Sequence, residues 1–228
     1  MSIKINVNVF LLLLLFMITK QMEIYALVML FALLHELGHL CAGILMKFQV
    51  NHFKVLPLGF AVEFKANLED YNEKIGRTRK ITLKKLVINI AGPLVNLVLM
   101  IISIVAHWNS NIIYANLIIF LINMLPIYPL DGGRIIKNIV KMIKGNRIAE
   151  KFTNQVSNLF VFIFSIIASI AIYYYQNIAI VFALMVLWSM VYYENKRFRT
   201  YNKIYKMIDK QVNYRYNEEE NIEKILHN

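Results

Sequence analysis

The stretch that decides this fold is Phe31-Ala32-Leu33-Leu34-His35-Glu36-Leu37-Gly38-His39-Leu40, which carries a His-Glu-x-x-His pattern inside an apolar run. Residues four apart share one face of a helix, so His35 and His39 can offer imidazole nitrogens to one metal ion. Glu36 lies near that ion but off the ligand face, where a carboxylate can take a proton from a water on the metal. This short pattern also occurs by chance, but polar groups in an apolar, membrane-type segment cost a few kcal/mol per charge. The stretch therefore predicts a metal site within a membrane helix.

The composition is typical of an integral membrane protein. Hydrophobic residues make up 58% of the 228 residues and the mean hydropathy is +0.52, whereas soluble domains are about half apolar. This length suits one compact bundle of about six spans without a large soluble domain. The net charge of +11 is explained first by membrane orientation and by anionic lipids at basic loops, so no nucleic-acid partner is expected. The single cysteine, Cys41, excludes an internal disulfide and a zinc site built from several cysteines.

Six apolar segments are the candidate spans, and the first of them is followed by no small-residue cleavage site, so it is expected to be a retained helix. They cover roughly residues 5–19, 24–46, 83–106, 112–125, 156–175 and 178–193. Charged residues then dominate the end of the chain. The predicted organisation is a polytopic membrane domain over 1–195 and a short charged cytoplasmic tail over 196–228, which is too small for a further folded domain.

The basic segment between the second and third spans predicts a β-hairpin. Residues 50–55 are rich in strand-forming types, and Phe60, Val62 and Phe64 alternate with other residues after the turn 56–59. The rest of this segment, 67–80, is polar and is expected to be a loop. The expected fold class is therefore all-α integral membrane, with about six transmembrane helices and a small membrane-associated β-hairpin after the second span.

A broken segment after the fourth span supplies a third candidate ligand. It reads Asn123-Met124-Leu125-Pro126-Ile127-Tyr128-Pro129-Leu130-Asp131-Gly132-Gly133-Arg134, where two prolines and two glycines forbid a regular helix. Irregular backbone at membrane depth is tolerated only where protein buries it or a watery cavity meets it. The break is thus expected to deliver Asp131 to the two histidines. An amphipathic helix over 135–148 is expected to follow at the basic interface.

Small and polar residues in the third span predict close helix contacts. Gly92 and Pro93 allow another helix to approach, and the proline frees a backbone carbonyl that a neighbour must satisfy. Asn89 and Asn96 lie seven residues apart on one face. Two interpretations stay open for them: interhelical hydrogen bonding, or a place in the lining of the active cavity.

The distribution of lysine and arginine predicts the orientation. These residues cluster after the second, fourth and sixth spans, while the opposite connections are nearly bare. The positive-inside rule then places both termini and the long loops in the cytoplasm. His39 lies about two helical turns, or about 12 Å, from the cytoplasmic end of its span. Asp131 follows the break of the fourth span on the same side, so the two halves of the site are expected at similar depth.

Two histidines and one carboxylate leave one zinc position open for water, as in hydrolytic zinc sites. Zinc would lower the pKa of that water toward about 7, and Glu36 would pass its proton to the departing amine of a cleaved peptide bond. A membrane-embedded substrate must first unwind. The hairpin edge at Phe60 and Val62 could hold it extended by strand addition, and Asn123 could assist with its amide.

These residues resemble the site-2 protease family of intramembrane zinc metalloproteases. The family pattern is His-Glu-x-x-His in one span and Asn-x-x-Pro-x-x-Pro-x-Asp-Gly in a later one, and here Asn123 to Gly132 carries the second. Residues 91–96 match a further family motif. The resemblance implies that His35, His39 and Asp131 bind one Zn²⁺, that Glu36 is the catalytic base and acid, and that two other residues engage substrate. Those two are Asn123 and Pro129.

Within the family, the chain is most similar to the sporulation branch, the stage IV sporulation protein FB type. That branch implies a membrane-tethered substrate, pro-sigma-K, and a membrane-protein inhibitor or regulator. It also implies a bacterial cell membrane as location, including the membrane that surrounds the forespore. The resemblance implies that the domain over 1–195 is an intramembrane metalloprotease domain without a PDZ insertion. Better-known members carry a nucleotide-sensing CBS domain, for which the tail over 196–228 leaves no room, so control by ATP through such a domain is not expected.

Two other functions remain open from the sequence. One is a related protease that cleaves anti-sigma factors or signal-peptide remnants. The other, of a different class, is a zinc-binding membrane transporter that uses the same ligands without hydrolysis. Glu36 separates the second alternative from the proteases, because a transporter has no need of a base beside the metal.

Overall fold

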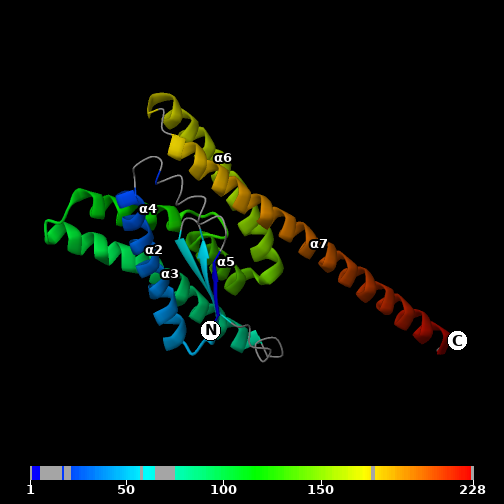
Figure 1. The fold of residues 1–228 in the computed structure, drawn as a ribbon. Helices are drawn as coiled ribbons and strands as arrows, with labels where there is room; N and C mark the ends of the chain where they lie inside the picture. The colour runs from blue at the N-terminus through cyan, green and yellow to red at the C-terminus, as the bar shows by residue number, and fades with distance from the viewer. Residues whose placement is uncertain are drawn as a thin grey trace. The chain divides into compact units, whose positions relative to one another are not determined.

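The computed structural model describes residues 2–5, 17, 22–56, 59–64, 75–175 and 178–226, and helices dominate them (Figure 1). The chain divides into two compact units, Met1–Phe160 and Val161–Asn228. The predicted metal site lies entirely in the first unit.

Three packed helices form the centre of the first unit. They are α2 (Met22–Leu45), α3 (Ile75–Val105) and α4 (Ser110–Met124). A buried apolar cluster of Phe31, Ala115 and Ile119 joins α2 to α4. The absence of a side chain at Gly38 lets α2 approach α3, since a Cβ atom there would lie 2.7 Å from Val95. The face of α2 that bears the histidines is thereby held against its neighbours.

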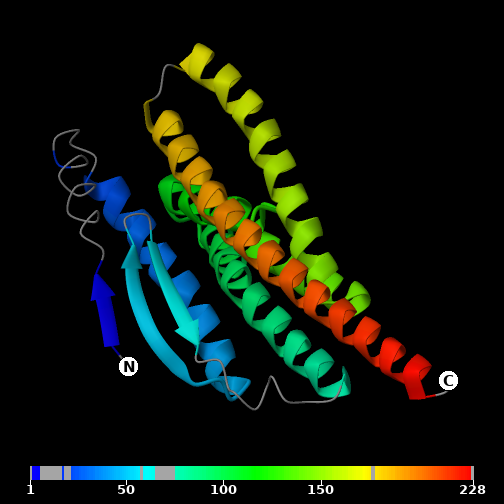
Figure 2. The same ribbon diagram turned by 90° about the vertical axis from the view of Figure 1, so that its right-hand side faces the viewer.

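A small sheet lies beside α2 (Figure 2). Its strands are β1 (Ser2–Ile5), β2 (Val50–Leu56) and β3 (Gly59–Phe64), in the order β1-β2-β3. The antiparallel β2–β3 hairpin, with Phe53 opposite Val62, confirms the predicted hairpin. The parallel strand β1 was not predicted. Because β3 packs against α2 and is last in the sheet order, its outer edge faces the histidine helix.

A tight turn connects α4 to α5 (Asp131–Lys144). Gly132 and Gly133 allow α5 to start directly against the backbone of the preceding segment, because a Cβ on Gly132 would collide with the Met124 carbonyl. The backbone amide of Tyr128 donates a hydrogen bond of 2.8 Å to the hydroxyl of Ser157, which lies on helix α6 (Asn146–Tyr175). The broken backbone thus brings Asp131, the first residue of α5, into the interior.

Helix α6 (Asn146–Tyr175) begins in the first unit and ends in the second. The second unit contains the rest of α6 and the whole of α7 (Ile178–Leu226), which is one continuous helix of 49 residues. Within this unit, Trp188 donates its indole N–H to the hydroxyl of Ser165 at 2.9 Å. The predicted domain boundary after residue 195 lies inside α7 and stays a prediction.

Three helices in the described residues are long and apolar enough to cross a membrane. They cover Met22–Leu45, Arg79–Val105 and Asn146–Tyr174, while Ser110–Met124 is apolar but shorter. An apolar helical protein is therefore observed, but the predicted number of six spans is not established. Most of the predicted first span, 5–19, lies outside the described residues.

Two predicted boundaries are wrong. The helix expected over 135–148 ends at Lys144, because Gly145 adopts φ 83°, a conformation that side-chain-bearing residues rarely take. The next helix starts at once with Asn146. The loop expected over 67–80 is helical from Ile75 onward, because α3 extends its polar first turns beyond the apolar segment. In both places a helix boundary did not follow the change from apolar to polar residues.

We expect Gly132→Ala to lower the thermal unfolding midpoint of the purified protein, because the added methyl group meets the Met124 and Leu125 carbonyls rather than a flexible side chain. The loss of stability should be about 1–3 kcal/mol, as for other overpacked sites. Intrinsic fluorescence during heating would measure it. An unchanged midpoint would show that α5 does not need this close approach.

Candidate metal centre

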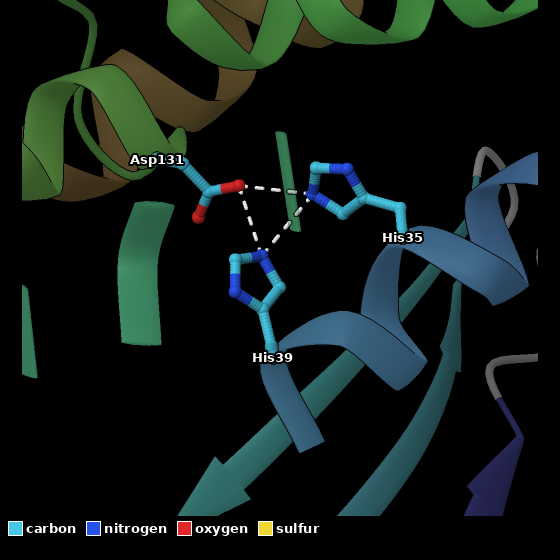
Figure 3. Close-up of side chains that lie close together, drawn as sticks. All are labelled: His35, His39 and Asp131. Atoms are coloured by element: carbon cyan, nitrogen blue, oxygen red, sulfur yellow. Dashed lines mark hydrogen bonds and ion pairs between the residues drawn. The ribbon is translucent and has the colours of Figure 1, made fainter. Parts of the chain in front are cut away.

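Three side chains converge in the first unit from two helices (Figure 3). His35 and His39 project from one face of α2, and Asp131 comes from the first turn of α5. The Nε2 atoms of the two rings are 3.1 Å apart, and Asp131 Oδ2 lies 2.9 Å from His35 Nε2 and 3.0 Å from His39 Nε2. All three residues are buried. This arrangement is a possible site for a metal ion.

The other nitrogen of each ring is held by a hydrogen-bond acceptor. The Nδ1 of His35 lies 2.6 Å from Asn96 Oδ1, and the Nδ1 of His39 lies 2.7 Å from the carbonyl oxygen of Ile88. Both partners accept, so each Nδ1 carries the proton. A neutral ring then presents the lone pair of Nε2 to the centre of the cluster, which is the tautomer that a metal ion requires.

The resulting donor set fits a cation. Two imidazole lone pairs and one carboxylate oxygen lie within 3.1 Å of one another and would repel each other unless positive charge lies among them. Two ligands bound at about 2.0–2.1 Å to a tetrahedral ion are about 3.3 Å apart. The observed triangle needs to open by only a few tenths of an ångström. Residues His35, His39 and Asp131 therefore suit one divalent ion.

The carboxylate of Asp131 has one positive partner. Its Oδ2 faces the two histidines, and its Oδ1 lies 3.5 Å from a guanidinium nitrogen of Arg134 one turn along α5. A positive charge this close favours the ionised form of a carboxyl group. Arg134 therefore helps to keep Asp131 in the form that binds a metal ion.

Glu36 lies beside this triangle and contacts the sheet. Its carboxylate accepts a hydrogen bond of 3.2 Å from the backbone N–H of Val62 on β3. Because this N–H is directed toward α2, it lies on the outer edge of β3 and points away from β2. The side chain is partly buried rather than enclosed. The Glu36 carboxylate, the two histidines and the edge of β3 therefore lie next to one another.

The backbone of α3 passes directly under the two rings at Gly92. A Cβ atom on this residue would lie 2.7 Å from His35 Nε2 and would collide with His39 Nε2. Only glycine leaves room here for the ligand atoms, or for an ion between them.

Residues 23–111 and 105–168 match the family model described as Peptidase family M50, and together they make up more than half of the chain. The chain belongs to peptidase family M50. The matched residues include all three members of the triangle and Glu36. Membership of a peptidase family agrees with a metal-binding donor set next to a carboxylate.

Two known proteins resemble this M50 chain. Stage IV sporulation protein FB of Bacillus subtilis (strain 168) is 28% identical over 144 residues, which cover 59% of this chain and 46% of that protein. The chain thus spans about half the length of this curated relative. The site-2 protease from Methanocaldococcus jannaschii has a similar fold, with a TM-score of 0.62 at 20% identity, covering 84% of this chain and 89% of that one. The likeness to this solved structure shows a shared fold.

The structure brings together the three predicted metal ligands and places Glu36 next to them. The four predicted substrate-binding residues are more dispersed. Phe60 and Val62 lie on β3, and Val62 reaches Glu36 through its backbone. Asn123 is in the last turn of α4 and donates to the Ile119 carbonyl at 3.0 Å. Pro129 lies in the turn that precedes Asp131. The chemical roles of all these residues remain predictions.

Sequence reasoning missed part of the support of the M50 site. Asn96 confirms the first of its two open interpretations, interhelical hydrogen bonding, since it bonds to His35 and also donates to Asn116 Oδ1 on α4 at 3.0 Å. Asn116 itself was not singled out. It has no exposed surface, and a polar residue inside an apolar helix was the available signal. The role of the Ile88 carbonyl could not be seen, because a backbone acceptor leaves no trace in residue type.

We expect Gly92→Ala to weaken metal binding by the purified protein, because its methyl group would clash with both Nε2 atoms. Displaced ligands of this kind cost at least about 10-fold in metal affinity. Metal content per chain, measured by elemental analysis, checks this. Leu94→Ala is the matched control on the same helix, since Leu94 is 49% exposed and should keep its metal. Equal metal content in both variants would contradict the arrangement.

Proposed function

We propose that this chain is an intramembrane zinc metalloprotease that hydrolyses a peptide bond in or near the membrane segment of a tethered protein. The single observation that carries the proposal is the buried triangle of His35, His39 and Asp131, with both imidazole lone pairs turned inward. Two histidines and one carboxylate are a donor set of hydrolytic zinc sites, which keep a fourth position open. Zinc is therefore the proposed ion.

The proposed chemistry divides between the ion and Glu36. A zinc ion held there would supply Lewis-acid polarisation of the scissile carbonyl and would acidify water. Glu36 takes the proton from the attacking water and later delivers it to the departing amine. The burial of the ligands strengthens each electrostatic interaction, because little water competes for the charges. Arg134, at 3.5 Å from Asp131, keeps the aspartate in its ionised form.

Substrate is proposed to bind as an added strand at the edge of β3, with Phe60 and Val62 among its contacts. The hydrogen bond from Val62 N–H to Glu36 supports this, because it places the open edge of the strand at the proposed base. Strand addition uses main-chain hydrogen bonds and needs an extended peptide. A scissile segment unwound in this way would cross the site next to Glu36. Asn123 and Pro129, before Asp131, are proposed to help hold it.

The proposed substrate is a sporulation sigma-factor precursor of the pro-sigma-K type. The support is the 28% identity to stage IV sporulation protein FB over 59% of this chain. A membrane-protein inhibitor or regulator is the proposed further partner. The proposed location is a bacterial cell membrane, including the membrane around the forespore, with a multi-pass domain over 1–195 and both termini in the cytoplasm. The basic loops support this orientation and contact with anionic lipids.

We expect Glu36→Gln to bind zinc as wild type does and to lose cleavage by about 10²–10⁴-fold, because glutamine cannot take a proton from water. The measurement is coexpression with a membrane-tethered pro-protein, followed by quantification of the processed form, together with the zinc content of the purified variant. Full cleavage by the Glu36→Gln protein would rule out the proposed base. Zinc binding with no cleavage in either protein, against a panel of tethered substrates, would favour the transporter.

We expect Val62→Pro to reduce cleavage while zinc content is unchanged, because proline removes the N–H that marks the open edge of β3. Edge positions tolerate proline when the lost N–H faces away from the sheet. Val62→Leu is the matched control, as it keeps the N–H and the apolar side chain. If both variants cleave the tethered substrate equally, strand addition at this edge is not the mode of binding.

A further inference from the structure

A line of buried hydrogen bonds runs from His35 to the backbone of α4. The Nδ1 of His35 donates to Asn96 Oδ1 at 2.6 Å, and Asn96 Nδ2 donates to Asn116 Oδ1 at 3.0 Å. Asn116 Nδ2 in turn donates to the carbonyl oxygen of Ile112 at 3.0 Å. Asn96 and Asn116 both have no exposed surface. Three helices are thus joined by side-chain amides behind one metal ligand.

The donors and acceptors in this line of hydrogen bonds all run in one direction, which is set at its far end, the Ile112 carbonyl. The Ile112 carbonyl can only accept, so the amide of Asn116 must turn its Nδ2 toward it and its Oδ1 toward Asn96. Asn116 Oδ1 can only accept as well, so Asn96 must present Nδ2 to it and Oδ1 to His35. His35 must then carry its proton on Nδ1. Each amide orientation follows from the one before it.

The reversed arrangement would disable the ligand. If the Asn96 amide turned over, its oxygen would face the Asn116 oxygen, and its NH2 group would face His35 Nδ1. A ring that accepts at Nδ1 carries its proton on Nε2, where no lone pair is left for a metal ion. The contact from Asn96 Nδ2 to the Phe31 carbonyl is 3.4 Å long, so it holds the amide less firmly than Asn116 does.

The second ligand is held differently. His39 donates directly to the Ile88 carbonyl at 2.7 Å, within one hydrogen bond of the backbone. The tautomer of His35 is fixed by a backbone carbonyl too, but two asparagine side chains lie between. A substitution at the remote end can therefore change one ligand and leave the other in place.

We infer that Asn116 is a positioning residue for the metal centre: it fixes the orientation of the Asn96 amide and so the metal-binding tautomer of His35. This inference rests on the proposed zinc function. It adds a determinant of metal affinity on α4, a helix that contributes none of the three ligands. Asn116 acts only through Asn96 and touches neither substrate nor ion.

The test compares two substitutions of the same branched shape in the full-length protein. Asn116→Leu removes the acceptor for Asn96. Asn116→Asp restores the whole line, because a carboxyl group buried there is neutral, donates its O–H to Ile112 and accepts from Asn96. Zinc affinity is measured by competition with a chelator. We expect Asn116→Leu to bind zinc about 10-fold more weakly and Asn116→Asp to bind close to wild type.

Two further proteins make the outcome decisive. Ser103→Ala is the matched control, since Ser103 is also fully buried but its hydroxyl donates to the Leu99 carbonyl of its own helix; its zinc affinity should not change. Asn116→Ala removes the acceptor without added bulk, should leucine not be accommodated. The zinc-free forms of the variants are heated to compare their unfolding midpoints, which a structural role would lower together with affinity.

Several results would overturn the inference. Wild-type affinity in Asn116→Leu or Asn116→Ala would do so, as would an equal loss in Asn116→Asp. Failure of every variant at this position to fold without zinc would make the contact structural and would also overturn it. If the wild-type protein itself binds no zinc, the proposed function fails instead. The two failures are therefore distinguishable.

Discussion

The structure depends on one electrostatic constraint: three hydrogen-bond acceptors converge in a place with almost no water. The Nε2 atoms of His35 and His39 and the Oδ2 of Asp131 lie within 3.1 Å of each other. Such a cluster is unfavourable without positive charge, since burial removes the bulk water that would otherwise screen the lone pairs. The acceptors of the two Nδ1 protons hold the rings in this state. The fold thus creates a site that binds a cation more tightly than any one of these residues would alone.

The close approach of the helix backbones makes this site possible. Gly38 admits α3 against α2, Gly92 clears the space under the rings, and Gly132 lets α5 begin beside the end of α4. In a membrane, helices gain little from burying apolar side chains against one another, so packing of small residues and interhelical hydrogen bonds stabilise their association. The same glycines that bring the helices together also set the positions of the ligands. Stability and site geometry therefore have a common origin here.

The sequence allowed the ligand set to be predicted, because its signals are local. A spacing of four residues puts His35 and His39 on one helix face, and prolines with glycines mark the break before Asp131. The hairpin was predictable from alternation. The short strand β1 was not, since Ser2–Ile5 merges into an apolar run and gains its structure by pairing with β2. Asn116 was not either, because its role depends on which helix lies opposite, a property of the assembled bundle.

Helix α7 has a consequence that follows from length alone. Its 49 residues at about 1.5 Å each make a rod of about 74 Å, while the hydrocarbon layer of a bilayer is only about 30 Å thick. No tilt within the usual range lets such a rod fit inside the lipid. A large part of it must therefore lie outside the hydrocarbon layer, in water or along the headgroups.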